Sequence, residues 1–297
     1  MQTRYRAAAT ALLLTATTGL AATGAAHASG THHPGARAAS KLVVTIKSKA
    51  SGVKVSETKI RPGNTIFKVK NAGGPNGLMQ LMRLKSGYGL NDAFADFGAA
   101  FPQGNTPPDV AAVRRIDKNV VFYGGMETPH KAGKVNKWAV NVDHTGTYYV
   151  VNLDANALTS FKVAGQHQRR AMPGATGTID AAPGPGGAGN AFKPGKHNAH
   201  QGWMNTTNTA HEPHFVVTQH VKEKTTKKDI LKALSSNAPP KFFLPGGTDT
   251  GVISPHHTFR WAYGFPKGKY FVTCFWPSKS DGMPHAFMGM ISLYHLS

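Results

Sequence analysis

Cysteine is almost absent from this chain of 297 residues, in which Cys274 stands alone. A single cysteine cannot form a disulfide within the chain, so burial of apolar side chains has to stabilise the fold. In an exported protein an odd cysteine is a free thiol, an intermolecular bridge or a ligand. Burial and metal ligation would both protect such a thiol from oxidation, and both interpretations are open at this point.

Long apolar runs are missing as well. The one small-residue and apolar stretch, residues 7–22, is too short and too rich in Ala and Thr for a permanent membrane helix. It follows a basic start and precedes a small-residue cleavage site at 26–28, so residues 1–28 are predicted to be a secretory signal peptide. Residues 29–40 are predicted to be a flexible arm. We therefore expect a secreted, extracellular protein, with attachment to the cell wall as an option.

Acidic residues are scarce, with 14 Asp and Glu against 34 Lys and Arg and a formal charge of +20. The basic residues are spread along the chain and follow no nucleic-acid-binding motif, which argues against a nucleic-acid partner. An acidic cell-wall polymer or an acidic protein partner fits this charge. Motifs of hydrolases, zinc proteases and phosphate-binding loops are also missing, so the sequence gives little support to an enzyme.

Short alternating apolar segments predict an all-β protein in two parts. Residues 41–165 form the first part, and 166–196 have the Gly- and Pro-rich composition of a linker whose second half forms an irregular strand. Residues 197–297 complete the second part. Helical spacing of apolar residues predicts short helices at 90–100 and 227–234. One predicted strand ends at Asn208. The other predicted strands span 42–47, 53–60, 65–71, 137–142, 147–153, 215–221, 258–263, 269–275 and 290–295.

The two parts repeat one another. Gly146–Asn152 aligns with Gly268–Cys274 without a gap, and Tyr123-Gly-Gly aligns with Pro245-Gly-Gly at the same offset. Such a repeat predicts an internal duplication, with two tandem Greek-key β-sandwiches and a short helical insertion in each. Where the second copy has His214 and Cys274, the first copy has Gly77 and Asn152.

Soft metal-ligand types gather in the second copy only. His285 and Met290 follow Cys274, and His214 lies sixty residues upstream of the cysteine. One thiolate, two imidazoles and a weak thioether are the ligands of a blue-copper electron-transfer site. Each residue alone could serve packing only, since free cysteines are commonly buried in cores. The joint presence of these residue types in one copy and their joint absence from the other favour a metal site.

The Pro213-His214 segment and the Gly-x-Tyr-x-x-x-Cys274 strand followed by Pro284-His285 and Met290 resemble those of the cupredoxins, in particular the plastocyanin- and azurin-like proteins. This resemblance implies one copper ion in the second domain, held by His214, Cys274, His285 and axial Met290, and a first domain without metal. Ten residues separate Cys274 from His285, more than in most single-domain cupredoxins, and Met288 is a competing thioether.

Three functions remain open from the sequence. The first is one-electron transfer or copper handling, with a redox protein as the partner. The second is a metal-free β-sandwich that binds an acidic wall polymer or a protein. The third is a copper oxidoreductase with a further site between subunits, an expectation that rests on analogy of fold.

Overall fold

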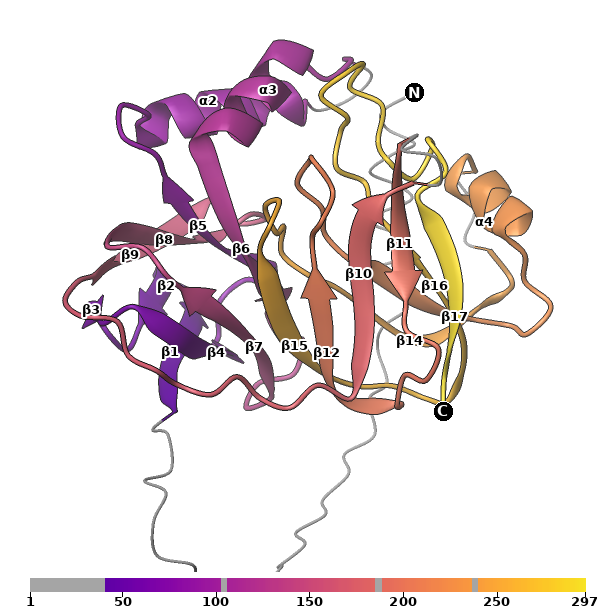
Figure 1. Cartoon of the computed structure of the whole chain (residues 1–297), viewed down its shortest axis with the longest axis horizontal. Coiled ribbons are helices and arrows are strands. Elements are labelled where there is room, and N and C mark those ends of the chain that lie inside the picture. The colour runs from indigo at the N-terminus through magenta and orange to yellow at the C-terminus, as the bar shows by residue number, and fades with distance from the viewer. Residues whose placement is uncertain (1–40, 103–105, 185–188, 237–239) are drawn as a thin grey trace, which may run out of the picture.

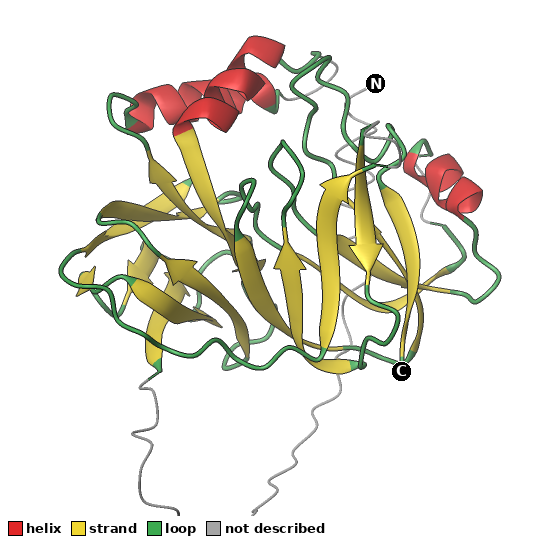
Figure 2. Cartoon of the chain, viewed as in Figure 1, coloured by secondary structure: helices red, strands yellow, loops and turns green. Residues whose placement is uncertain are grey.

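The computed structural model describes residues 41–102, 106–184, 189–236 and 240–297. The predicted signal peptide and arm therefore lie outside the described residues. Within the described ranges the chain is mostly β-structure with three helices (Figures 1 and 2), and the predicted all-β class is confirmed. In this part of the chain, no helix has the length and apolar character that crossing a membrane requires.

The first half is a β-sandwich. A five-stranded sheet of order β3-β9-β8-β5-β6 packs against strands β2-β1-β4-β7 of a larger sheet. Along β4 buried and half-buried residues alternate, which turns Phe67 inward, 6.1 Å from Phe161 of the opposite sheet. The strands are β1 (Leu42–Lys49), β2 (Gly52–Val55), β3 (Lys59–Ile60), β4 (Gly63–Asn71), β5 (Leu78–Leu84), β6 (Val120–Glu127), β7 (Val135–Val142), β8 (Gly146–Asn152) and β9 (Ala157–Val163).

The second half repeats this plan. A four-stranded sheet of order β14-β13-β16-β17 faces strands β11-β10-β12-β15 of the larger sheet. Two of these strands, β10 and β11, form an antiparallel pair inside the segment predicted as a linker. The strands are β10 (Gly177–Pro183), β11 (Asn190–Pro194), β12 (Gln201–Thr207), β13 (Val217–Val221), β14 (Phe243–Asp249), β15 (Thr258–Gly264), β16 (Gly268–Thr273) and β17 (Ile291–Leu296).

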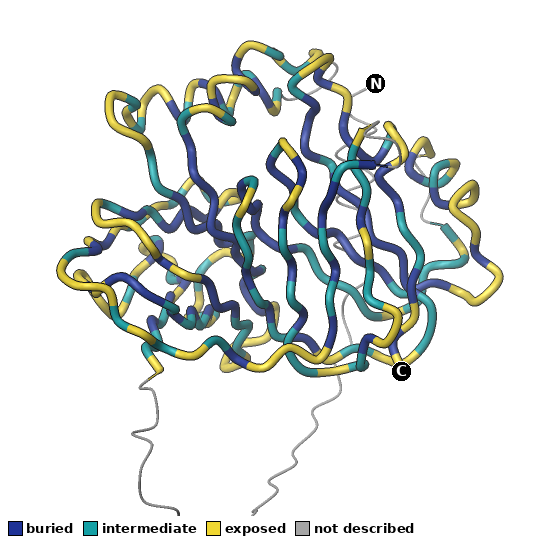
Figure 3. Tube along the Cα trace, viewed as in Figure 1, coloured by how far each residue is buried: buried dark blue, intermediate teal, exposed yellow. Residues whose placement is uncertain are grey.

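The two halves share one sheet. Strand β7 of the first half pairs antiparallel with β15 of the second, which makes an eight-stranded sheet across the whole molecule. Trp138 faces Trp261 at this junction, and the segments Lys137–Ala139 and Arg260–Ala262 are alike in sequence. Equivalent tryptophans of the two halves therefore pair with each other, so the two strands are related by a local two-fold axis. The larger of two clusters of buried apolar side chains spans both halves. Figure 3 shows buried residues along the strands of both halves.

Two of the three described helices belong to the first half. α2 (Leu90–Ala100) and α3 (Val110–Asn119) lie between β5 and β6, and the Arg115 guanidinium binds the Asp96 carboxylate at 2.6 Å to join them. α4 (Lys227–Leu234) follows β13 and begins with a capping box of Thr226 and Asp229. The predicted helices at 90–100 and 227–234 are confirmed, whereas α3 was not among the predicted elements.

A pair of carboxyl groups lies at the seam between the halves. The bridge between Met126 and Thr250 places Glu127, at the end of β6, beside Asp249, at the end of β14. Burial and then the charge of Asp249 raise the pKa of Glu127, and burial and then the charge of Asp154 raise the pKa of Asp249. The folded protein thus holds these protons more tightly than the unfolded chain does.

Replacement of Glu127 by Gln is expected to flatten the dependence of stability on pH. A carboxyl group with a raised pKa contributes stability that is complete below its unfolded pKa and is lost as the pH rises through the folded pKa. In urea unfolding between about pH 5 and about pH 8, E127Q should therefore lose less stability than the wild type. Replacement of the exposed Glu57 serves as the control, and parallel curves for E127Q and the wild type would refute the assignment.

Candidate metal centre

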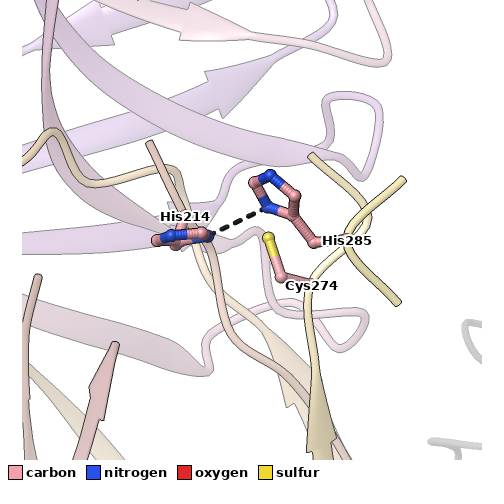
Figure 4. A group of neighbouring side chains, drawn as sticks. All are labelled: His214, Cys274 and His285. Atoms are coloured by element: carbon pink, nitrogen blue, oxygen red, sulfur yellow. Dashed lines mark hydrogen bonds between the residues drawn. The ribbon is translucent and has the colours of Figure 1, made fainter. Parts of the chain in front are cut away.

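Three candidate ligands converge at one end of the second sandwich. The imidazole nitrogens of His214 and His285 and the Sγ atom of Cys274 offer ligand atoms that all lie within 4.8 Å of one another (Figure 4). The two Nδ1 atoms are 3.1 Å apart. Among the described residues this is the one group of three or more His, Cys, Asp or Glu side chains with such spacing.

Different elements position the three side chains. His214 precedes β13 and exchanges two backbone hydrogen bonds with Ile253, at 3.1 Å and 2.8 Å. Cys274 is the residue that follows β16. His285 lies in the loop between β16 and β17, and all three side chains are at most 1% exposed. The group is therefore anchored by strands and closed to solvent.

Backbone hydrogen bonds close the long loop between cysteine and histidine. The N–H of Ala286 donates to the Cys274 carbonyl at 2.7 Å, and the N–H of His285 donates to the Trp276 carbonyl at 3.0 Å. Pro277 also forms an isolated bridge with Pro284. The ten intervening residues thus project as a separate loop, and His285 returns beside Cys274. The unusual length of this segment does not separate the two side chains.

The first half covers this loop. The Arg114 Nε atom on α3 donates to the Lys279 carbonyl at 2.8 Å. The indole ring of Trp276 packs edge-on against Phe101, at the end of α2, and Phe122 of β6, with ring centroids 5.3 Å and 5.4 Å away. The helical insertion of the first half therefore stabilises the segment that presents His285.

The two methionines near His285 differ in burial. Met290 lies directly before β17, is 1% exposed, and donates its backbone N–H to the His285 carbonyl at 2.9 Å. Its own carbonyl accepts a hydrogen bond from the Thr273 hydroxyl at 2.9 Å. Met288 is 43% exposed. The predicted axial ligand thus shares the buried end of the sandwich, while the competing thioether faces solvent.

Electrostatics separate the two imidazoles. Burial, followed by the neighbouring charge of His285, holds the pKa of His214 well below its usual value. Burial also lowers the pKa of His285, but its interactions with the Cys274 thiol and the Glu212 carboxylate outweigh burial and raise this pKa to about 9. His214 is thus neutral near pH 7, which is the form that ligates a metal.

Further polar residues near His285 were not predicted from the sequence. The Glu212 carboxylate lies 2.6 Å from Nε2 of His285, and Nδ2 of Asn190 lies 3.4 Å from the same atom. Burial and then the charge of Glu212 raise the pKa of Asp117 on α3 to about 7. An acidic residue two positions before His214, in a chain with few acids, was the one available signal for Glu212.

The residue types and spacing fit a metal ion. Ligands about 2.0–2.3 Å from an ion in tetrahedral or trigonal geometry lie about 3.3–3.8 Å apart, which falls within the observed separations. The Nε2 atom of His214 is buried and has no hydrogen-bond partner in the described structure. The Nδ1 atom of His214, in contrast, faces the group formed with His285 and Cys274. The polar contact of this ring is therefore on its Nδ1 side.

Among the described residues, the corresponding end of the first half has no such group. A Cβ atom built on Gly77 would lie 2.1 Å from Oδ1 of Asn152, so the counterparts of His214 and Cys274 are also neighbours. Oδ1 of Asn152 instead accepts hydrogen bonds from the N–H groups of Asp154 and Ala155, both at 3.2 Å. Hydrogen bonding within the loop thus replaces the ligand set in this half.

No protein-family model and no curated protein sequence matches the chain. Among solved structures, auracyanin B is 16% identical, with 43% of this chain and 92% of that chain covered and a TM-score of 0.27. Auracyanin A, a "blue" copper protein from Chloroflexus aurantiacus, is 13% identical, with 42% and 100% covered and a TM-score of 0.27. The Cu-containing nitrite reductase from Thermus scotoductus is 10% identical, with 86% of this chain and 61% of that chain covered and a TM-score of 0.23. The two-sandwich fold is given by the strand order of the chain itself, and its function is proposed from its own side chains.

Proposed function

We propose that this chain is an exported copper protein that binds one ion in its second half for one-electron transfer or copper handling. The observation that carries the proposal is the buried convergence of His214, Cys274 and His285, whose ligand atoms lie within 4.8 Å of one another. Thiolate and imidazole donors suit copper, and a trigonal set of two histidines and one cysteine is typical of electron-transfer sites. Copper bound there would supply one-electron chemistry between Cu(I) and Cu(II).

Each residue has a distinct role in this proposal. Cys274 provides the thiolate, and His214 and His285 provide neutral imidazoles through their Nδ1 atoms. Met290 would be the fourth, weak ligand, and its buried position supports this role over that of exposed Met288. The stiff strands and the closed loop limit the movement of the ligands when the charge changes, which favours rapid electron transfer.

The surrounding chain supports a carrier that meets a protein partner. The charge of +20 would steer it toward an acidic redox partner. The helical insertion of the first half covers the loop between Cys274 and His285 through Arg114. The first half, which binds no metal in this proposal, thus contributes stability and contact. The proposal that the protein is exported depends on the predicted signal peptide at residues 1–28 alone.

A basic hollow favours a second candidate function, the binding of an acidic polymer or partner without metal. The hollow has a volume of about 370 Å³ and lies on the first half, away from the Cys–His group. Its lining combines basic and amide side chains that suit anions: Asn64, Asn141, His167, Arg169, Arg170 and Ala171. Under this alternative the three converging side chains would serve packing only.

Addition of Cu(II) to the purified protein is expected to produce an intense absorption band near about 600 nm from copper–thiolate charge transfer. Replacement of Cys274 by Ser should abolish the band, because the hydroxyl oxygen cannot replace the thiolate. The matched control is Asn152→Ser at the corresponding position of the first half, which should retain the band. Failure of the wild type to bind Cu(II), or Cu(I) under reduction, would favour the metal-free alternative.

Replacement of Met290 by Leu is expected to raise the reduction potential of the copper-loaded protein while the thiolate band persists. A weak axial thioether tunes the potential, and its removal takes a donor from the oxidised ion. Met288→Leu should leave the potential close to that of the wild type, since this side chain is exposed. Cyclic voltammetry distinguishes the two, and a larger shift for Met288→Leu would reverse the assignment.

A further inference from the structure

A carboxylate lies against the outer nitrogen of one candidate ligand. An oxygen of Glu212 is 2.6 Å from Nε2 of His285, while Nδ1 of the same ring is 3.1 Å from Nδ1 of His214. The Glu212 side chain is 12% exposed and the His285 side chain 1%. The pair is thus shielded from the solvent that weakens exposed ion pairs.

This contact fixes which nitrogen of His285 carries the proton. A carboxylate accepts hydrogen bonds, so Nε2 donates, and when the ring loses its other proton to become neutral the lone pair lies on Nδ1, toward the interior of the site. The Asn190 amide nitrogen, 3.4 Å from Nε2, is a donor that would need a lone pair on this atom, but the carboxylate contact at 2.6 Å is much shorter and keeps the proton on Nε2. The orientation needed for ligation through Nδ1 is therefore already present without the metal.

The backbone around Glu212 is itself held in place. Nδ2 of the fully buried Asn208 donates to the Glu212 carbonyl at 2.8 Å and to the Ile253 carbonyl at 3.0 Å. Ile253 in turn pairs with His214 through the backbone. Glu212 and His214 are therefore anchored to the same strand segment, and a displacement of one would displace the other.

No lysine or arginine neutralises the Glu212 carboxylate among the described ion pairs. The nearby Lys279 directs Nζ to the His211 carbonyl at 2.9 Å instead. The negative charge acts on the His285 ring through the direct contact and also on the carboxyl group of Asp117. Carboxylates that hold the outer nitrogen of a ligating histidine orient the ring and make it a stronger donor.

We propose that Glu212 is a positioning residue that holds His285 on the copper ion and lowers the reduction potential of the site through its charge. The inference rests on the proposed copper site. A more basic imidazole and a nearby anion stabilise Cu(II) more than Cu(I), since the oxidised ion carries the larger charge. Glu212, two residues before His214, thus supports the ligand set through its negative charge without binding the ion itself.

Two variants separate the charge from the contact. Glu212→Gln removes the charge and retains a side-chain oxygen that can accept from Nε2, whereas Glu212→Ala removes both. E212Q is expected to shift the reduction potential to more positive values with little loss of copper affinity. E212A should shift the potential similarly and lower the Cu(II) affinity by about 10- to 100-fold, as is typical for the loss of such partners.

The chain offers a matched control in a second glutamate–histidine pair. Glu223 lies 3.0 Å from Nε2 of His295, with side chains 66% and 62% exposed. E223Q should leave both the potential and the affinity unchanged. In the metal-free protein, ¹⁵N NMR recorded above the His285 pKa of about 9, where the ring is neutral, should show the proton on Nε2 in the wild type and in E212Q, and a mixed or reversed tautomer in E212A.

The outcomes separate this inference from the copper proposal. A wild type that binds copper, with E212Q and E212A equal to it in potential, affinity and His285 tautomer, would overturn the role of Glu212 alone. A wild type that binds no copper would overturn the copper site and this role with it. A potential that shifts equally in E212Q and E223Q would show a general effect of net charge and also refute the proposal.

Discussion

The site depends on the closure of one loop. Two backbone hydrogen bonds, from Ala286 to Cys274 and from His285 to Trp276, return the chain after ten residues to the point where it left the strand. Without this closure the two ligands would be ends of a long flexible segment, and the entropy of bringing them together would oppose metal binding. With it, the thiol and the imidazole are neighbours before any ion is present.

The first half contributes to this preorganisation although it has no ligand set of its own. Its sheet continues into the second half through the pair β7–β15, and its helices cover the projecting loop. Trp276, two residues after Cys274, is packed by Phe101 and Phe122 of the first half. The packing of the first half thus supports the segment that presents His285 in the second half.

Much of the fold was predictable because its signals are local. Alternation of apolar residues marks strands such as β4, and helical spacing marks α2 and α4, which occupy the predicted residues 90–100 and 227–234. Helix α3 was missed because its buried face consists of only a few small or branched residues after a Pro-Pro segment. The shared eight-stranded sheet was missed because strand pairing between halves leaves no local pattern.

The candidate site likewise contains residues that the sequence suggested and one that it did not. The soft-ligand types around the single cysteine suggested His214, Cys274 and His285, and the comparison of the two copies supported them, since residue types that change together between repeats indicate a shared purpose. Glu212 could not be assigned, because its contact with His285 spans 73 residues and depends on how two loops meet. Long-range polar contacts of this kind are properties of the folded chain.

The central claim is that one thiolate and two imidazoles bind the same copper ion. X-ray absorption at the copper edge, recorded on protein loaded with one equivalent of Cu(II), measures this ligand set directly. The account predicts one sulfur at about 2.2–2.3 Å and two nitrogens at about 2.0 Å. A first shell of nitrogen and oxygen without a short sulfur distance would contradict it.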